Sequence, residues 1–195
     1  MSTFFRTQMT GRRGNPLVLR KILPNPDLVI ASTGADIGFY IVSLVGQVIF
    51  NNYVFSNNRA ITKSMLTWWA FQDPDQELLS LESTIEIEHI YARNRQEKEH
   101  SLSNPRNVES IGNKALLEKR INIRASDYRF SDKVKYYVGY ENSRKQKKEG
   151  TKIKELTDLA ATAADFTETD IVQRNAKILF GFVDYMHSNG LLSED

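Results

Sequence analysis

Glu88 and His89 stand side by side in the run EIEHI, and Asn113 and Asn122 follow later in the chain. An imidazole can take a proton from water near neutral pH. Carboxylate and amide oxygens suit Mg²⁺ or Mn²⁺ better than zinc. Hydrolysis of a phosphodiester needs both kinds of group, a base for the water and a cation for the charge on the phosphate. These residues therefore predict a site for metal-assisted phosphodiester cleavage.

The elements that must hold these residues are a strand before His89, a second strand, and a helix. Alternation along a strand turns Glu86 and Glu88 to one side and His89 to the other. Because acid and base must meet at one site, we expect the strand to end or twist at Glu88. We expect the second strand region over Glu109–Leu117 and the start of the helix, or its approach, over Glu118–Asn122.

The run EIEHI, the later GNKALL and Asn122 together resemble the HNH, or His-Me finger, nucleases. Two further pairs, Phe130 with Lys133 and Ile171 with Arg174, resemble the C-terminal nuclease domain of GmrSD-type modification-dependent restriction enzymes. The HNH domain of RNA-guided CRISPR effector nucleases shares the same acid-His-Ile, Asn-Lys and terminal Asn pattern. The resemblance covers about half of the chain, whereas a lone EHI would be uninformative.

The resemblance implies a role for each motif residue. His89 would be the general base, and Glu88 and Asn122 would hold a single divalent cation, Mg²⁺ or Mn²⁺. Asn113 would brace the loop that carries the base, and Lys133 would reach a phosphate. The implied activity is cleavage of DNA in the restriction of foreign or modified DNA.

Three positions depart from the common pattern of these nucleases. Ala92 stands where many relatives have a proline, and Glu88 stands where an aspartate is common. Asn122 replaces the second histidine of the HNH name, although asparagine is familiar there in this branch. Because glutamate is one methylene longer than aspartate, we expect the cation to sit slightly farther out.

Composition limits the possible sites and classes. The 195 residues are 41% hydrophobic and 26% charged, as in a soluble globular protein. The absence of cysteine excludes disulfides and Cys-ligated zinc, and three histidines are too few for a multi-histidine metal centre. No segment reaches the roughly 18 apolar residues of a membrane span. We therefore expect a cytoplasmic protein without membrane contact.

Basic residues outside the motif are candidates for contacts with DNA phosphates. The net charge of +2 is too small to indicate nucleic-acid binding by itself, so binding must depend on local patches. Arg93 begins the long loop expected over Arg93–Asn107 and lies nearest His89. A basic run over Asn142–Lys154 is either a nucleic-acid contact or a flexible connection kept soluble by charge. Its candidate phosphate ligands are Lys145, Lys147 and Lys148.

Helical periodicity dominates the flanks of the motif. It predicts a buried helix over Ile37–Val54 and a second helix carrying Trp68 and Trp69, of which one should enter the core. A helix is also predicted from a cap at Ser131 and Asp132, and another has an apolar face that includes Ile153 and Leu156. A last helix is predicted from a capping-box-like start at Thr167 and Asp170.

The predicted fold is α+β, mainly α, with a small ββα-metal core embedded between helices. We expect one compact unit in three parts: a basic arm and helical region over 1–83, the HNH-like core over 84–140, and a helical region over 141–195. The chain has no glycine-rich phosphate loop, so no NTP site is expected. Because members of the restriction family that the chain resembles usually carry an upstream domain linked to nucleotide hydrolysis, the resemblance implies a separate NTPase or specificity subunit or domain as a partner, besides DNA. The alternative function is a catalytically inactive module that binds nucleic acid or another subunit.

Overall fold

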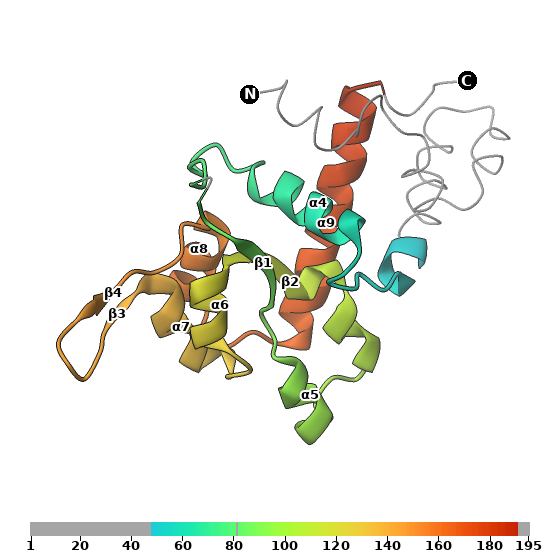
Figure 1. The fold of residues 1–195 in the computed structure, drawn as a ribbon. Helices are drawn as coiled ribbons and strands as arrows, with labels where there is room; N and C mark the ends of the chain where they lie inside the picture. The colour runs from blue at the N-terminus through green and yellow to red at the C-terminus, as the bar shows by residue number, and fades with distance from the viewer. Residues whose placement is uncertain (1–47, 81, 191–195) are drawn as a thin grey trace, which may run out of the picture.

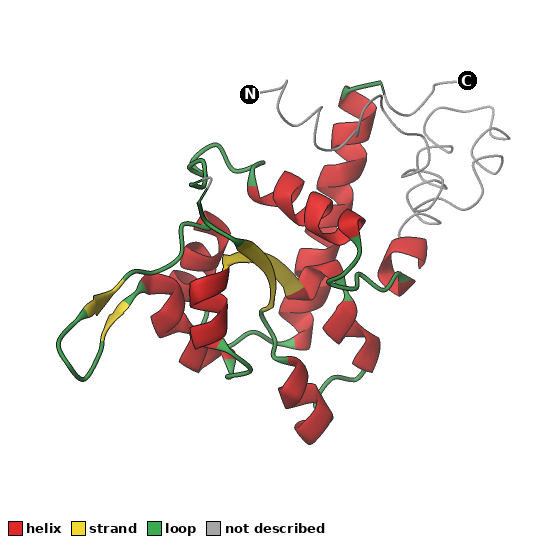
Figure 2. Cartoon of the chain, in the orientation of Figure 1, coloured by secondary structure: helices red, strands yellow, loops and turns green. Residues whose placement is uncertain are grey.

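The computed structural model describes residues 48–80 and 82–190, which are mainly helical with small antiparallel sheets (Figures 1 and 2). The elements are α4 (Ala60–Ala70), β1 (Ile85–His89), α5 (Arg93–Glu99), the 3-10 turns η2 (Pro105–Glu109) and η3 (Ile111–Asn113), β2 (Lys114–Glu118), α6 (Lys119–Ala125), α7 (Phe130–Val138), β3 (Tyr140–Glu141), β4 (Lys147–Lys148), α8 (Lys154–Thr162) and α9 (Glu168–Ser188). The predicted α+β, mainly α class is confirmed. The predicted division into three parts stays a prediction.

The centre of the fold is the antiparallel pair of β1 and β2, and α6 begins directly after β2 (Figure 1). The register runs from Ile85 opposite Glu118 to His89 opposite Lys114. α6 packs against both strands and α4 packs against β2. Since β2 has neighbours on both faces, residues 114–117 are all buried instead of alternating with exposed positions.

Helix α9 fixes the segment that leads into β2. Its first turn is closed by the predicted capping box, in which Thr167 and Asp170 bond to each other's backbone amide. Arg174 donates from Nη1 to the carbonyl oxygens of Ile111 and Gly112, both at 2.9 Å. A Cβ atom on Gly112 would lie 2.2 Å from the carbonyl oxygen of Ile171, so only glycine permits this close approach.

The two adjacent tryptophans divide as predicted. Trp68 is buried in the core, where it packs edge-on against Phe182 with 5.3 Å between the ring centres. Trp69 is partly exposed, and its indole N–H donates to Glu155 at 2.7 Å. Helix α4 thus packs one tryptophan into the core and uses the other as a polar contact to α8.

The segment Arg93–Asn107 is not the continuous loop that we predicted, because α5 and the start of η2 lie within it. The sequence of α5 has no apolar periodicity, and tertiary contacts hold it. Arg95 Nη1 lies 3.2 Å from Oδ1 of Asp165 in an ion pair, and the guanidinium carbon of Arg95 lies 4.8 Å from the centre of the Tyr91 ring. Local patterning could not reveal these contacts.

Three predicted boundaries also differ from the structure. β1 extends one residue past Glu88, because His89 still pairs with Lys114. β2 begins only at Lys114, whereas Glu109 closes a 3-10 turn. Helix α7 begins at Phe130 after Arg129, without a side-chain cap from Ser131 or Asp132.

The basic run over Asn142–Lys154 contains β4 and the turn of a short hairpin. β3 and β4 pair with Tyr140 opposite Lys148, and the hairpin projects away from the other elements (Figure 1). Of the predicted buried helix over Ile37–Val54, residues 48–52 are helical, but the helix ends before Tyr53 and Val54, and Val48 is 62% exposed. Residues 37–47 and the basic arm lie outside the described residues. Within the described ranges, no helix is long and apolar enough to cross a membrane.

Candidate active site

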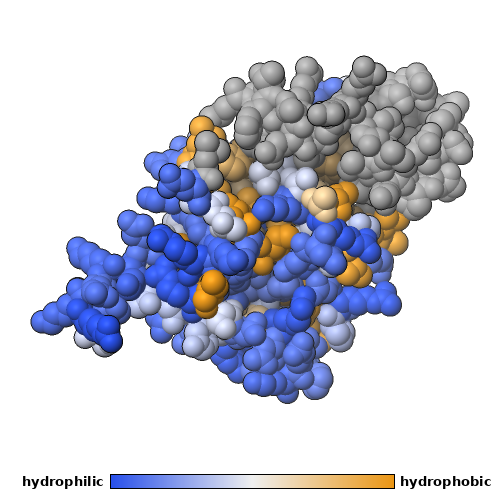
Figure 3. Space-filling view, in the orientation of Figure 1, coloured by the Kyte–Doolittle hydropathy of each residue, from blue (hydrophilic) through white to orange (hydrophobic). Residues whose placement is uncertain are grey.

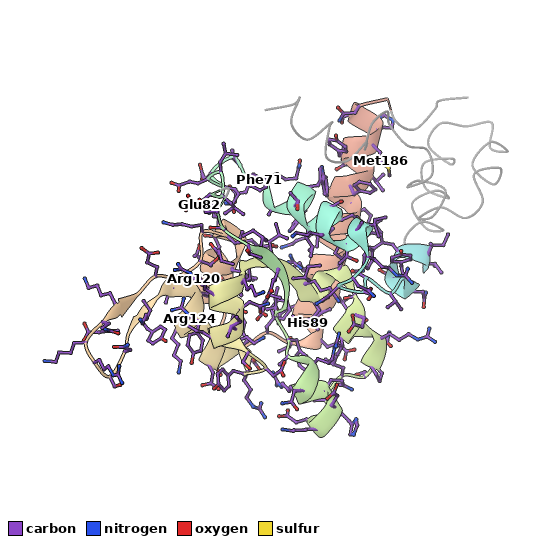
Figure 4. All side chains as sticks on the ribbon, viewed as in Figure 1. Phe71, Glu82, His89, Arg120, Arg124 and Met186 are labelled. Carbon is purple, nitrogen blue, oxygen red and sulfur yellow. The ribbon has the colours of Figure 1, made fainter. Side chains whose placement is uncertain are left out.

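A pocket of about 220 Å³ opens where β1, α6 and α7 meet. It is lined by four of the predicted site residues, Glu88, His89, Asn122 and Lys133, together with Ile87, Ile123, Ser126 and Asp127. In Figure 4, His89 lies near the centre of the molecule, and Arg120 and Arg124 on α6 lie to its left. Pairing of β1 with β2 and the immediate turn into α6 therefore bring residues from positions 88 to 133 to one place.

The carboxylate of Glu88 is buried and held by two donors from α7. Lys133 Nζ and the hydroxyl of Tyr137 both donate to Oε1 at 2.7 Å. Lys133 also donates to the backbone oxygen of His89 at 2.6 Å. Burial, and then the charge of Glu88, raise the pKa of Tyr137 well above 10, so its hydroxyl remains a donor. Oε2 is left without a hydrogen-bond partner among the described residues.

The ring of His89 is mostly buried and faces a carboxylate from the segment before β2. Its Nε2 lies 3.5 Å from Oε1 of Glu109, which is longer than an ordinary hydrogen bond, and Nε2 itself is buried. Burial lowers the pKa of His89 from its ordinary 6.5, and the charges of Lys114 and Arg93 lower it further against the opposing effect of Glu109. A neutral imidazole, the form that can accept a proton, is therefore favoured near pH 7.

Glu109 belongs to a cluster of charged side chains that contacts the ring of His89. Arg93 donates to its Oε1 at 2.6 Å, and the buried Lys114 donates to its Oε2 at 2.6 Å. Lys114 is also held by the side-chain oxygen of Asn57 at 2.6 Å. The His89 contact and the Lys114 ammonium hold the pKa of Glu109 well below its usual range, although partial burial opposes them. Glu109 is therefore a carboxylate at neutral pH.

Asn113 is fully buried, and its side chain makes hydrogen bonds with the backbone of two segments, one at Tyr91 and one at Val108. Its side-chain oxygen accepts from the amide of Tyr91 at 2.7 Å, and its Nδ2 donates to the carbonyl oxygens of Tyr91 and Val108 at 3.0 Å. Its own carbonyl oxygen accepts from the amide of Ile90 at 2.9 Å. These contacts hold Ile90 and Tyr91, the two residues that follow His89.

Asn122 projects from α6 into the pocket, and its Nδ2 donates to Oε2 of Glu86 at 3.0 Å. Because this contact uses the amide nitrogen, the amide oxygen is left to act as a ligand. The described residues contain no group of three His, Cys, Asp or Glu side chains that could hold a metal. One oxygen each from Glu88 and Asn122 suits a cation such as Mg²⁺, which usually keeps several waters. The donor set thus fits a largely hydrated cation.

A family model described as the C-terminal domain of GmrSD restriction endonucleases matches residues 49–179. The chain belongs to this family. Its membership confirms the resemblance and identifies a nuclease domain of the restriction-endonuclease type. Comparison with curated proteins and with solved structures gave no significant match.

The remaining predicted site residues of this GmrSD-type domain lie at different distances from the pocket. Arg93 has a half-exposed side chain and is paired with Glu109, outside the pocket wall. The hairpin carries the other three residues, Lys145 in its turn and Lys147 and Lys148 in β4. The part of the hairpin visible in Figure 3 is hydrophilic.

Two partners that orient the site of this GmrSD-type domain, Glu109 and Tyr137, were not among the predicted site residues. Glu109 reaches His89 only through the path of the 3-10 turns; Asn104 and Pro105 mark the start of the first turn in the sequence, but not the direction of the Glu109 side chain. Tyr137 lies four positions after Lys133, so both fall on one face of α7. That spacing could have identified Tyr137 once Lys133 was assigned to the site.

Proposed function

We propose that this chain is a divalent-metal-dependent endonuclease with an HNH-type ββα-metal core that hydrolyses phosphodiester bonds in DNA. The observation that supports it best is the single pocket shared by Glu88, His89 and Asn122. A base and two hard oxygen ligands beside one cavity are the groups that metal-assisted hydrolysis needs. The role in restriction of foreign or modified DNA follows from the family.

In this mechanism His89 takes a proton from a water molecule in the pocket, and the resulting hydroxide attacks the phosphorus. The bond from phosphorus to the leaving oxygen breaks, and that oxygen takes a proton from solvent. Asn113 keeps the loop after His89 in place, which fixes where the proton is taken. Glu88 and Asn122 would hold Mg²⁺ or Mn²⁺ through Oε2 and the amide oxygen. The cation, when bound, would neutralise charge on the phosphate and the leaving oxygen.

Lys133 has a double role in this proposal. Its ammonium group has three N–H donors, and two of them are used by Glu88 and by the carbonyl oxygen of His89. The first contact orients the carboxylate that would bind the cation. The third donor remains for a phosphate oxygen, since Lys133 belongs to the pocket wall.

DNA outside the scissile phosphate would contact the exposed basic residues. Arg93 uses Nη2 for its ion pair with Glu109 and is half exposed, so its other N–H donors can contact a phosphate while the ion pair remains. Lys145, Lys147 and Lys148 on the projecting hairpin would add affinity that does not depend on sequence. A cytoplasmic location and a separate NTPase or specificity partner are part of the same proposal.

The test is a plasmid-nicking assay with Mg²⁺ or Mn²⁺ on wild type and His89→Ala. We expect nicking by the wild type and a loss of about 10²- to 10⁴-fold in the variant, the usual contribution of a general base. His100→Asn is the matched control, because His100 is exposed at the end of α5 with φ of 48°, a conformation that asparagine tolerates. Nicking that persists in His89→Ala would remove the proposed base.

The second candidate function is a module that binds DNA or a partner subunit without cutting. It is favoured by one contact, the salt bridge of Glu88 with the buried Lys133, which already neutralises the proposed metal ligand. DNA binding that needs no metal, together with no nicking under any condition, would select this function. A stable protein complex without DNA affinity would select the subunit-interaction form.

A further inference from the structure

Glu109 is the described carboxylate that faces the ring of His89, yet it does not line the pocket. The contact joins Glu109 Oε1 to Nε2 of the ring at 3.5 Å. Nε2 is buried and has no closer partner in the described part of the chain. Water in the pocket therefore cannot reach Nε2, and any proton transfer between the ring and water must use Nδ1.

Several contacts fix Glu109 in this position. Its backbone oxygen accepts from the amide of Phe55 at 3.0 Å, which holds the main chain at the end of η2. Arg93 and Lys114 each donate to one oxygen of its carboxylate at 2.6 Å. The carboxylate therefore cannot turn away from His89 without losing a charged hydrogen bond.

The chemistry of the two groups then determines where the imidazole carries its proton. A carboxylate without a proton can only accept hydrogen bonds, and a neutral imidazole has one N–H and one lone pair. A lone pair on Nε2 facing Oε1 would be repelled, whereas an N–H there is attracted. Lys114 and Arg93, two cations whose charges act on the ring, are both paired with Glu109 and so stabilise its negative charge.

We propose that Glu109 is a positioning residue that keeps the proton of neutral His89 on Nε2, so that Nδ1 is the atom that accepts the proton of the attacking water. This inference rests on the proposed function for the role of His89 as base. When Nδ1 takes the proton, His89 becomes an imidazolium, and its Nε2–H then donates to the negative Glu109. The 3.5 Å contact is expected to shorten at that point, since catalytic hydrogen bonds are often long in free enzymes.

The experiment combines ¹⁵N NMR of the histidine rings with cleavage kinetics. The ring signals of His89 are assigned by their loss in His89→Ala, and the spectrum is recorded at a pH where the ring is neutral. We expect a proton-bearing Nε2 and a bare Nδ1 in the wild type. In Glu109→Gln we expect the Nδ1-protonated form to appear and kcat to fall about 10- to 100-fold, the usual cost of losing an orienting partner. KM should change little, because Glu109 does not line the pocket.

The matched control is Glu99→Gln, which removes another ion-paired glutamate. Glu99 pairs with Arg95 and Arg129 on the side of α5 and should affect neither the His89 spectrum nor kcat. If Glu109→Gln fails to fold, Glu109→Asp keeps a charge for Lys114 while withdrawing the carboxylate from His89. That variant should show the same changes to a smaller degree.

Each outcome decides the inference. A wild-type His89 that carries its proton on Nδ1, or Glu109 variants that change neither the tautomer nor kcat, would overturn it. The NMR result stands even if the domain does not cleave DNA. Failure of the proposed function can therefore be distinguished from failure of the role of Glu109.

Discussion

Replacing Lys133 with methionine tests the electrostatic arrangement on which the proposed metal site depends. Lys133 and Glu88 have side chains that are only 1% and 4% exposed, and their charged atoms lie 2.7 Å apart. Lys133→Met leaves a buried carboxylate with the hydroxyl of Tyr137 as its remaining donor. Loss of one partner from a buried ion pair costs about 3–5 kcal/mol, so we expect a decrease of this size in the free energy of unfolding.

The assay is urea unfolding of four proteins: wild type, Lys133→Met, Glu88→Gln and the double variant. The double variant should recover most of the stability lost in Lys133→Met, because it removes the uncompensated charge. Lys135→Met is the matched control, since Lys135 is exposed on the same helix, and it should change stability by less than about 0.5 kcal/mol.

Magnesium gives this experiment a second readout. Lys133→Met removes a positive charge next to the proposed ligand Glu88, so Mg²⁺ should bind the variant more tightly than it binds the wild type. Mg²⁺ at 100 times its dissociation constant would then return about 2.7 kcal/mol of stability. A loss below about 1 kcal/mol without metal would contradict a buried, uncompensated charge on Glu88, and no response of the variant to Mg²⁺ would contradict its role as a metal ligand.

Three further predictions follow from other parts of the structure. Changing Lys145, Lys147 and Lys148 together to Gln should weaken DNA binding. The slope of the logarithm of the DNA-binding constant against the logarithm of the salt concentration should become shallower by about 0.9 for each phosphate that the hairpin no longer neutralises. The control Lys177→Gln, on α9, should leave the slope unchanged. Gly112→Ala should destabilise the fold by about 1–3 kcal/mol or more in urea unfolding, because its Cβ would lie 2.2 Å from the carbonyl oxygen of Ile171; an unchanged midpoint would contradict the close approach. The pKa of Glu109 in the folded domain is well below its ordinary 4.5, so as the pH falls the unfolded chain binds a proton at this residue before the folded domain does. The stability that the ionised Glu109 contributes is therefore present above pH 4.5 and is lost as the pH falls further. Stability should therefore fall more steeply with acid in wild type than in Glu109→Gln, and parallel curves measured by thermal unfolding between about pH 6 and about pH 3, a range that spans the ordinary pKa of glutamate, would exclude this contribution.

Short-range patterns in the sequence predicted the helices and strands that are stabilised mainly by interactions between residues close in sequence. The apolar faces of α4 and α9, the capping box at Thr167 and the strand–helix order around His89 are all encoded in short spacings. The division of Trp68 and Trp69 follows from the same helical geometry, because adjacent residues cannot share one face.

Contacts between distant segments could not be predicted in this way. Helix α5 has no apolar stripe and is held by Arg95 against Asp165 and Tyr91. Glu109 was assigned to a strand region, and only the 3-10 turns around it direct its carboxylate to His89. The packing of α7 buries Lys133 against Glu88, a contact that the spacing of charges in the sequence does not reveal.

The most direct test of the proposed site is a crystal of the protein soaked in Mn²⁺ and measured with anomalous scattering. We predict one peak in the pocket, about 2.0–2.3 Å from a carboxylate oxygen of Glu88 and from the amide oxygen of Asn122, with His89 facing the ion without binding it. A peak elsewhere, or none while the pocket is intact, would contradict the account.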